Sequence, residues 1–560
     1  MPIDKQSIRI IDFSGGLNTF NKSDKILDNQ LAEVLNCQPV GPGLGPRGGT
    51  VDFQTGDSTW TDRVSSIASL NDHTNGHAIV VTEASQLRRY TGSATWVGIK
   101  GALTLPTDTL WSWVQFNDVT LGGVLIGVNR GTGSNDNPVV IKNASSNAVA
   151  LGGTPPKGRY IAAINQRVFI VPEELPDQVD FCSLGNVEDW TTTTAGIAAG
   201  TIVIGDNVLG DITGIVPYRE SLIVFFATKT YEIQFSGTSL SAAAGGDPLA
   251  TNETIWQVNV ISEKVGCLSM RSVQEVMGDL IFLSGHGIIS LQGLLVTGEQ
   301  DITSAILSGN IKELNGLSVS HDNFCSEVIP GKSQYIISGK LSGTGDNDFC
   351  YIMDFDGLSK QTGPIAWYRF DGDMIGESYL STIDFNNEHV LFIGSAKPAG
   401  TAKLFKYILT EVQDDGNDFI VRIKSKTFDF GVPLLRKKFY KVGSSITALD
   451  AVANLVFGYT LDSQEELRDK VFNLTFNPVQ VGVALYGTAI YGTDTYGTRL
   501  DISADFKMKV SGVGGRLAKQ IQLFLIRSTD TNFILNSFVI DLSVQSDKYI
   551  TSSDVQLSIS

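Results

Sequence analysis

Seven short apolar segments recur between residues 60 and 410, and each follows a polar or glycine-containing turn. Their sequences are AIVV, VLIGV, RVFIV, LIVFF, LIFLS, QYIIS and HVLFIG. The spacings between them are 45, 44, 55, 58, 54 and 56 residues, measured at Ile79, Val124, Val168, Ile223, Ile281, Tyr335 and Leu391. Because an apolar run of this length between turn residues is typical of a buried β-strand, the pattern predicts one structural unit every 44–58 residues.

Each apolar segment is followed by a second strand-like segment, so each unit contains a hairpin. The first of these second segments is QLRRY at residue 86, and the last is KLFKYI at residue 403. Units of this length without intervening helix match the blades of β-propellers, in which a blade buries its apolar face only against neighbouring blades. The sequence therefore predicts an all-β fold with a seven-bladed β-propeller over residues 61–410. A long antiparallel sandwich or a β-solenoid is the alternative.

The segment before the repeat, residues 1–60, has a different pattern. It contains FSGGLNT, a short stretch from Asp28 to Asn36 that predicts a helix with Asp28 as its cap, and GPGLGPRGG at residues 41–49. The last stretch has too much glycine and proline for a regular element. We therefore expect an extended N-terminal arm with one short helix.

The segment after the repeat, residues 411–560, continues the strand pattern without the period. FKMKVSG alternates apolar and polar residues, and IQLFLI and FVIDLSV are further strand-like runs. This pattern predicts a C-terminal β-sandwich-like domain. Helix is expected elsewhere only at residues 301–314 and at residues 463–470, where a capping-box spacing begins the second segment.

The composition is that of a folded chain, with 42% hydrophobic, 9% aromatic and 18% charged residues. A net charge of −17 argues against a groove that grips nucleic acid by neutralising phosphates. The five cysteines are scattered without a CxxC pair, so we expect free thiols. No apolar run is long enough to span a bilayer and the start lacks an apolar secretory core, so we expect synthesis in a cytoplasm and no membrane segment.

No motif in the sequence predicts catalysis or a cofactor. The five histidines have no metal-binding spacing, and GxSxG is absent. A GxGxxG match at residues 43–48 contains Pro46, which removes a backbone amide that a phosphate site would need. The 59 acidic residues single out no glycosidase pair, and the aspartate box of sialidases does not occur. We therefore expect a non-enzymatic protein with no catalytic, cofactor-binding or metal-binding residues.

A repeated Tyr-Gly-Thr triplet near the C-terminus is one candidate interaction site. The triplets begin at Tyr486, Tyr491 and Tyr496, and their five-residue period belongs to neither helix nor strand. The repeat predicts a looped tip whose tyrosines pack between subunits or contact a surface glycan. A local loop held by its own tyrosines is the alternative.

A basic cluster in this acidic chain is the second candidate. It consists of Arg436, Lys437 and Lys438, with Lys441 close by. Such a cluster favours contact with an acidic neighbour or, alternatively, marks a solvated strand edge.

Several fold-forming segments resemble proteins of tailed bacteriophages. These are the opening IDFSGGLNT, the asparagine at Asn36, the PRGG at residues 46–49, and the segments 215–235 and 265–291. The last two resemble the propeller core of tail hub or nozzle proteins of short-tailed phages, including packaged-DNA stabilisation proteins. The resemblance covers residues 10–410, lies in strands, and includes no catalytic motif.

The resemblance implies a structural virion component of the phage tail, made in the host cytoplasm. It implies a homohexamer around the tail channel that retains packaged DNA and conducts it during ejection. The implied partners are further copies, adaptor or portal proteins on one side, a distal tip or fibres on the other, and double-stranded DNA without sequence-specific binding. An acidic lining suits this role, because a carboxylate and a phosphate about 10 Å apart in water repel by only about 0.4 kcal/mol.

Three other functions stay open from the sequence. A propeller lectin or adhesin that binds a host glycan needs exposed aromatic pockets on one face. A propeller glycosidase needs one essential pair of carboxylates. A third reading keeps the phage tail but assigns another position, such as an adaptor.

Overall fold

The computed structural model describes residues 5–544 except for positions 55–59, 61, 73–75, 84, 93–94, 107–109, 131–136, 194–196, 205–209, 236–255, 299–300, 318–322, 342–344, 356–364, 396–401, 449–452, 463–469, 477–501, 510–515, 528 and 530–531. The tyrosines Tyr486, Tyr491 and Tyr496 lie outside the described residues, as does nearly all of the helix expected at 463–470.

Strands make up nearly all of the regular structure, which confirms the predicted all-β fold class. Within the described residues there is one α-helix, α1 (Leu291–Thr297), which Ser290 caps by accepting a hydrogen bond from the Gly293 amide. The remaining helical turns are of the 3-10 type: η1 (Met270–Ser272), η3 (Ile302–Ala305), η4 (Lys312–Leu314) and η5 (Gly372–Met374).

Four four-stranded antiparallel sheets follow one another along the chain, and in each the strands are neighbours in chain order. They are β7 (Val64–Asp72), β8 (Gly76–Glu83), β9 (Gln86–Tyr90) and β10 (Val97–Gly98); β11 (Trp111–Asp118), β12 (Gly122–Asn129), β13 (Val139–Ile141) and β14 (Val149–Ala150); β15 (Gly158–Ile164), β16 (Arg167–Pro172), β17 (Gln178–Phe181) and β18 (Gly200–Val203); and β19 (Ile212–Tyr218), β20 (Ser221–Phe226), β21 (Thr230–Phe235) and β22 (Trp256–Ser262).

Three further meanders continue this series. They are β23 (Gln274–Val276), β24 (Asp279–Ser284) and β25 (Gly287–Ser290); β26 (Cys325–Ile329), β27 (Gln334–Gly339), β28 (Phe349–Asp354) and β29 (Ala366–Phe370); and β30 (Gly376–Ile383), β31 (His389–Ser395) and β32 (Leu404–Ile408). The last meander receives β6 (Gly49–Asp52) from the N-terminal segment as its fourth strand, and the short strands β33 (Gln413–Asp414) and β34 (Asn417–Asp418) extend it.

The helix expected over residues 301–314 is wrong. Only η3 and η4 form there, because the chain between them extends along the edge of β25. Ile306 bridges Ile289, and the Leu307 amide donates to the Ile288 carbonyl. Pairing with an existing strand thus outweighs the local helix preference.

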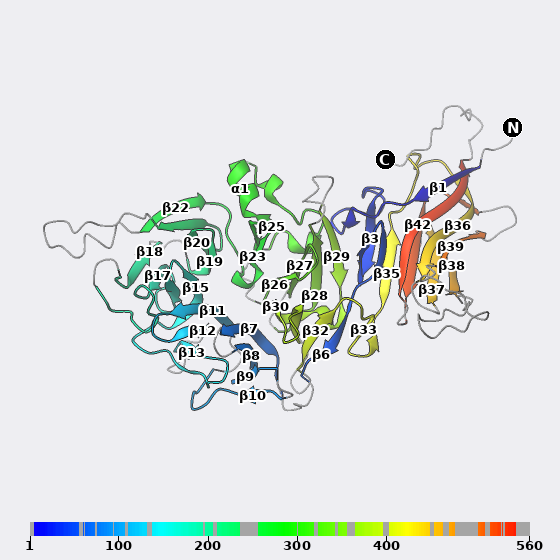
Figure 1. The fold of residues 1–560 in the computed structure, drawn as a ribbon. Helices are drawn as coiled ribbons and strands as arrows, with labels where there is room; N and C mark the ends of the chain where they lie inside the picture. Colours follow the sequence, from blue (N-terminus) through cyan, green and yellow to red (C-terminus); the bar gives the residue numbers. More distant parts are fainter. Residues whose placement is uncertain are drawn as a thin grey trace, which may run out of the picture.

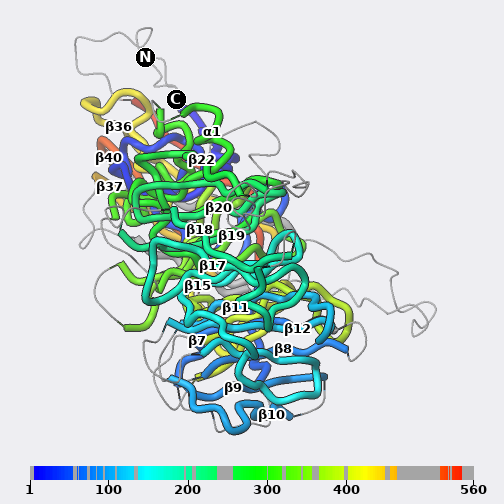
Figure 2. Tube along the Cα trace, turned by 90° about the vertical axis from the view of Figure 1, so that its left-hand side faces the viewer, coloured from blue at the N-terminus to red at the C-terminus, as the bar shows by residue number. Residues whose placement is uncertain are grey.

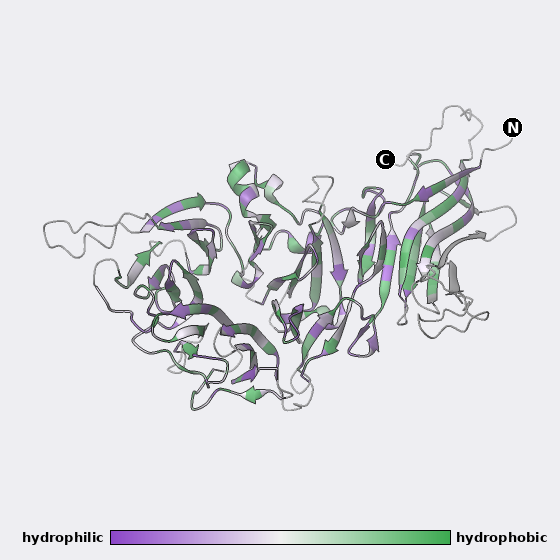
Figure 3. Ribbon diagram, viewed as in Figure 1, coloured by the Kyte–Doolittle hydropathy of each residue, from purple (hydrophilic) through white to green (hydrophobic). Residues whose placement is uncertain are grey.

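The middle strands of the series are buried on both faces. Every residue of β16 and of β20 is buried, which explains why these strands are continuous apolar runs without alternation. Separate apolar clusters lie between one sheet and the next. Phe225 of one sheet and Phe282 of the next, for example, have ring centroids 4.8 Å apart. Apolar residues are accordingly spread over all the sheets (Figure 3).

The first strands of successive sheets face a common centre. β7 contacts β11, β11 contacts β15, and β15 contacts β19; η1 then contacts both β19 and β26. β26 contacts β30, and β30 contacts β7, so the last meander of the series is a neighbour of the first. Figure 2 shows the first four sheets following one another upward from the bottom of the view, where β9, β11, β15 and β20 mark one sheet each.

The N-terminal segment is distributed over several sheets. Its strands are β1 (Gln6–Ile10), β2 (Gly16–Leu17), β3 (Gln30–Leu35), β4 (Cys37–Val40) and β5 (Gly43–Pro46), followed by β6. The helix expected from Asp28 to Asn36 is wrong, because this stretch forms β3. β3 pairs with β2 and β29 in parallel and with β35 (Val421–Ser425) antiparallel, and these partners impose an extended backbone.

Because of these pairings, β3 joins the strands of the sixth meander to the C-terminal strands. The sheet runs in the order β26-β27-β28-β29-β3-β35-β41-β37-β38. Figure 1 shows β3 and β35 between β29 and the C-terminal strands on the right. The added strands are β41 (Ile521–Arg527), β37 (Ala453–Leu461) and β38 (Lys470–Phe476).

A second sheet packs against the C-terminal end of this one. It contains β36 (Lys437–Ala448), β39 (Ile502–Lys509), β40 (Arg516–Ala518) and β42 (Phe533–Val544), together with β1, β4 and β5. Phe457 of the first sheet and Phe538 of the second have ring centroids 6.2 Å apart within one shared apolar cluster. The two sheets thus share one apolar core, which also includes residues of the last two meanders.

A buried polar network holds the junction between the two parts. The side-chain oxygen of Asn36 accepts hydrogen bonds from Arg47 Nε (2.9 Å) and the Asp371 amide (2.8 Å), and its Nδ2 donates to the Ile420 carbonyl (2.8 Å). Arg47 also donates to both carboxylate oxygens of Asp414, and to the carbonyls of Gly48 (2.7 Å) and Asp371 (2.8 Å). All five guanidinium hydrogens are thus used.

Candidate functional site

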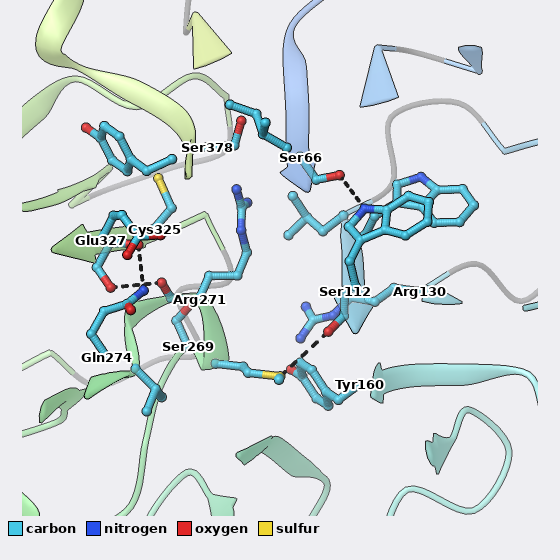
Figure 4. A pocket seen from close by; sticks show the side chains of 18 of the residues that line it. Ser66, Ser112, Arg130, Tyr160, Ser269, Arg271, Gln274, Cys325, Glu327 and Ser378 are labelled. Atoms are coloured by element: carbon cyan, nitrogen blue, oxygen red, sulfur yellow. Dashed lines mark hydrogen bonds between the residues drawn. The ribbon is translucent and has the colours of Figure 1, made fainter. Parts of the chain in front are cut away.

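A cavity of about 220 Å³ lies where the first strands of the sheets converge. Its lining comes from six of the successive meanders, so no single unit of the sequence repeat contains it (Figure 4). The lining residues are Ser66 and Ile67; Leu110, Trp111, Ser112, Trp113 and Arg130; Arg159 and Tyr160; Ser269, Met270, Arg271, Val273 and Gln274; Cys325, Ser326 and Glu327; and Ser378 and Tyr379.

Two of the three arginines in this wall, Arg159 and Arg130, contact neighbouring side chains. Arg159 forms a bidentate pair with Glu173, with N–O distances of 2.7 and 3.0 Å, and also pairs with Asp211. The Glu173 hydrogen bonds contribute most to raising the pKa of Arg159. Arg130 lies over the ring of Tyr160, 4.6 Å from its centroid.

Arg271 differs from the other two, because its hydrogen bonds go to backbone oxygens. Its Nη2 donates to the carbonyl of Ser65 at 3.2 Å and to the carbonyl of Glu377. Its Nη1 is buried and has no hydrogen-bond partner among the described residues. The guanidinium therefore bridges β7 and β30 and keeps one donor nitrogen unsatisfied.

Glu327 is the carboxyl group in the described lining. Its Oε1 accepts from the amide of Val328 at 3.0 Å. Burial raises the pKa of Glu327 to about 7, although hydrogen bonds from the Val328 and Ser381 backbone oppose the shift. Gln274 lies beside it and donates from Nε2 to the Ser326 carbonyl at 2.8 Å.

Aromatic side chains form the facing part of the wall. Trp111 and Trp113 stack with centroids 5.1 Å apart, and Trp113 Nε1 donates to the hydroxyl of Ser66 at 2.9 Å. The Ser112 hydroxyl lies 4.0 Å from the sulfur of Met270. The cavity thus combines aromatic surface with guanidinium, amide and hydroxyl groups.

The cysteine in the lining is not poised as a nucleophile. Cys325 is buried and its thiol donates to the Gly376 carbonyl at 3.3 Å. Burial raises the pKa of Cys325 to about 12, so the thiolate does not form at neutral pH. All five cysteines are buried free thiols, as the sequence predicts. In the described part of the chain, no group of three or more His, Cys, Asp or Glu side chains is placed to hold a metal ion.

The predicted basic cluster lies in the C-terminal part, on and just before β36. Lys437 is buried, and its ammonium donates to the carbonyls of Val432 (2.8 Å), Leu435 (3.1 Å) and Lys519 (2.7 Å). Burial lowers its pKa to about 8. Arg436 is exposed and Lys438 is partly exposed. The cluster is therefore divided: Lys437 ties three backbone segments together, and the predicted interaction now rests on Arg436 and Lys438.

The structure thus brings together a set of residues that differs from the predicted one. Arg130, Arg159, Arg271 and Glu327 come from four different meanders, and no local spacing connects them. A usable signal was present, because each of these residues is a charged side chain at or beside a first or second strand of an otherwise apolar unit. No helix in the described residues has the length and apolar character needed to span a membrane.

Comparison with models of protein families and with curated protein sequences finds no match. Several solved structures are similar at low scores. Three of them are the extracellular domain of a hybrid two-component system from B. thetaiotaomicron (10% identity, TM-score 0.38, covering 88% of this chain and 62% of that chain), a streptogramin B lyase (10%, 0.35, 65% and 98%), and BamB from Moraxella catarrhalis (12%, 0.30, 72% and 100%). The chain thus spans less than two thirds of the first of these structures. Similarity at this level identifies no function.

Proposed function

We propose that this protein is a non-enzymatic structural subunit of a bacteriophage tail, a hub or nozzle component that forms a ring around the DNA channel. In that position it retains packaged DNA and conducts it during ejection. The phage setting comes from the resemblance over residues 10–410. The structural observation that carries the proposal is the sheet from β26 to β38, in which β3 connects the two parts of the chain.

Each subunit of the assembly would contain a seven-bladed propeller. The seven meanders that contain the repeated apolar segments are its blades, and the apolar clusters between them are the blade interfaces. Contact between β30 and β7 supports closure of the propeller within one subunit. The insertion of β6 beside β32 supports it further, because an N-terminal strand then completes the final blade.

A tail subunit has to transmit load between neighbours without bending internally, and the junction has the groups for this. The Asn36 and Arg47 hydrogen bonds connect β3 with the chain after β29 and before β35. Phe419 adds a packed layer, because the guanidinium groups of Arg47 and Arg527 both lie over its ring, 4.0 and 4.5 Å from its centroid.

Assembly of the full-length chain tests the proposal. Light scattering and negative-stain electron microscopy are done on the protein alone and with the portal-side or adaptor proteins encoded beside it. We expect rings with a mass six times the 60.3 kDa of one chain, alone or on the partner. Antibodies against the chain should label the tail end of purified virions.

Two results would overturn the proposed tail function. A protein that is absent from purified virions and that binds host cells as a single chain, with competition by free glycan, overturns the proposal in favour of an adhesin. Turnover of an oligosaccharide that is lost on neutralising one carboxylate overturns it in favour of a glycosidase.

A further inference from the structure

We propose that the cavity between the first strands binds a small oxyanion, a carboxylate or a phosphate, and that Arg271 is its principal ligand. This inference goes beyond the structural role proposed above. It rests on the charge of the wall, on the state of Arg271 and on the size of the space.

The charge of the wall is opposite to that of the chain. The described lining contains three arginines and one carboxyl group, although the chain as a whole carries −17 charges. Arg159 is offset by Glu173 and Asp211. The carboxyl of Glu327 opposes an anion only in part, because burial raises its pKa to about 7. Outside the lining, the buried Glu377 carboxylate lies near Arg271 and Arg63 and offsets part of their charge. The lining itself still holds more cationic than anionic side chains.

Arg271 has a fixed guanidinium with one donor nitrogen that no described residue satisfies. Two backbone oxygens hold Nη2 and so fix the plane of the guanidinium. Nη1 is buried without an acceptor among the described residues. A buried donor without an acceptor is unfavourable, and an oxyanion supplies both the acceptor and the countercharge. Because both hydrogens of Nη2 are used by backbone oxygens, Nη1 is the nitrogen of Arg271 that presents donors to a ligand.

The remaining wall sets the size and the secondary contacts. A cavity of about 220 Å³ admits a small molecule and is below the usual range for drug-sized ligands. Gln274 and Ser112 provide an amide and a hydroxyl within the same wall, and Figure 4 shows them on different sides of the space from each other. Trp113 and Tyr160 provide apolar surface for the carbon skeleton of a carboxylate.

Isothermal titration calorimetry on the full-length chain tests the inference. Inorganic phosphate and succinate are titrated separately at constant ionic strength, with sodium chloride as the reference titration. We expect saturable one-to-one binding of at least one of the two anions and none of chloride. Phosphate alone or succinate alone each supports the proposal and identifies which oxyanion the site prefers.

Two substitutions locate the binding. Arg271→Gln should weaken binding by at least about tenfold, because it removes the positive charge and the Nη1 donors. Arg436→Gln makes the same chemical change on an exposed arginine of the C-terminal part and should leave binding unchanged. If Arg271→Gln does not fold, as judged by circular dichroism, Ser112→Phe serves instead, because it fills the cavity and leaves Arg271 in place.

The proposal is overturned by the absence of saturable heat with both anions. It is also overturned if binding persists unchanged in the folded Arg271 variant or in Ser112→Phe, since the anion then binds elsewhere.

Discussion

Arg47 and Asp414 lie 367 residues apart in the sequence and form a bidentate ion pair, with Nη1–Oδ1 and Nη2–Oδ2 distances of 2.8 and 2.6 Å. Arg47 is 1% exposed and Asp414 is 6% exposed. The pair therefore closes the junction in an environment that water barely reaches. Its formation requires the N-terminal strands and the segment after the last meander to meet, so it also reports on correct assembly of the chain.

Removing one partner of this pair should be strongly destabilising. Arg47→Met leaves the Asp414 carboxylate buried without its cation, and we expect the free energy of unfolding to fall by about 3–5 kcal/mol. Urea denaturation followed by fluorescence measures it. Arg219→Met, on an exposed arginine, is the control and should change stability by less than about 0.5 kcal/mol. Equal effects of the two substitutions would contradict a special role of the pair.

Lys437 and its neighbour Lys438 offer a matched comparison. Lys437→Met leaves the carbonyls of Val432, Leu435 and Lys519 without their donor, and we expect a loss of about 2–4 kcal/mol. Lys438→Met removes a partly exposed charge and its distant contact with the Tyr440 ring, and should cost less than about 0.5 kcal/mol. Thermal and urea unfolding of the two variants side by side measure the difference. A small effect at Lys437 would mean that water replaces the ammonium.

Glu327 should make stability depend on pH. Its pKa is about 7 in the folded protein against an ordinary 4.5, so the folded state holds the proton more tightly than the unfolded chain in that window. Stability therefore falls as pH rises from 4.5 to 7 and is then constant with respect to this group. Glu327→Gln removes this contribution to the pH dependence of stability.

The difference in unfolding free energy between Glu327→Gln and wild type should consequently grow in favour of the variant by about 2–3 kcal/mol across the same window. Urea unfolding at a series of pH values gives the two curves. Parallel curves would show that the carboxyl ionises normally.

Gly49 should tolerate no side chain. A Cβ atom there would lie 2.0 Å from the Gln413 carbonyl oxygen, so β6 would have to move away from β33. We expect Gly49→Ala to cost about 2–3 kcal/mol. At Gly98 a Cβ meets nothing within 4 Å, and Gly98→Ala should be nearly neutral. The melting temperatures of the two variants check this, and similar shifts would contradict the close approach.

The sequence predicted the part of the fold in which burial is uniform. All seven reference residues lie in the second strands of the meanders, such as Ile79 in β8 and Leu391 in β31. These strands are covered by a sheet on both faces, so they must be continuously apolar, and that requirement is visible locally.

The errors fall where distant partners decide the conformation. Residues 30–35 form a strand because β29 and β35 lie on either side of it, and neither partner is near in the sequence. The burial of Lys437 depends on carbonyls that include the one of Lys519, which lies on another strand connection. The cavity was missed for the same reason, because Arg271 and Glu327 belong to different units.

The long sheet also has a mechanical consequence. It starts at β26, whose residues Cys325, Ser326 and Glu327 line the cavity, and it finishes at β38 in the far C-terminal strands. Along this path β3 is paired with β35 at four positions but with β29 only at Leu35 and Arg369. The narrow ladder between β29 and β3 is therefore the step at which a load on the C-terminal strands would be passed on to the wall that holds Glu327.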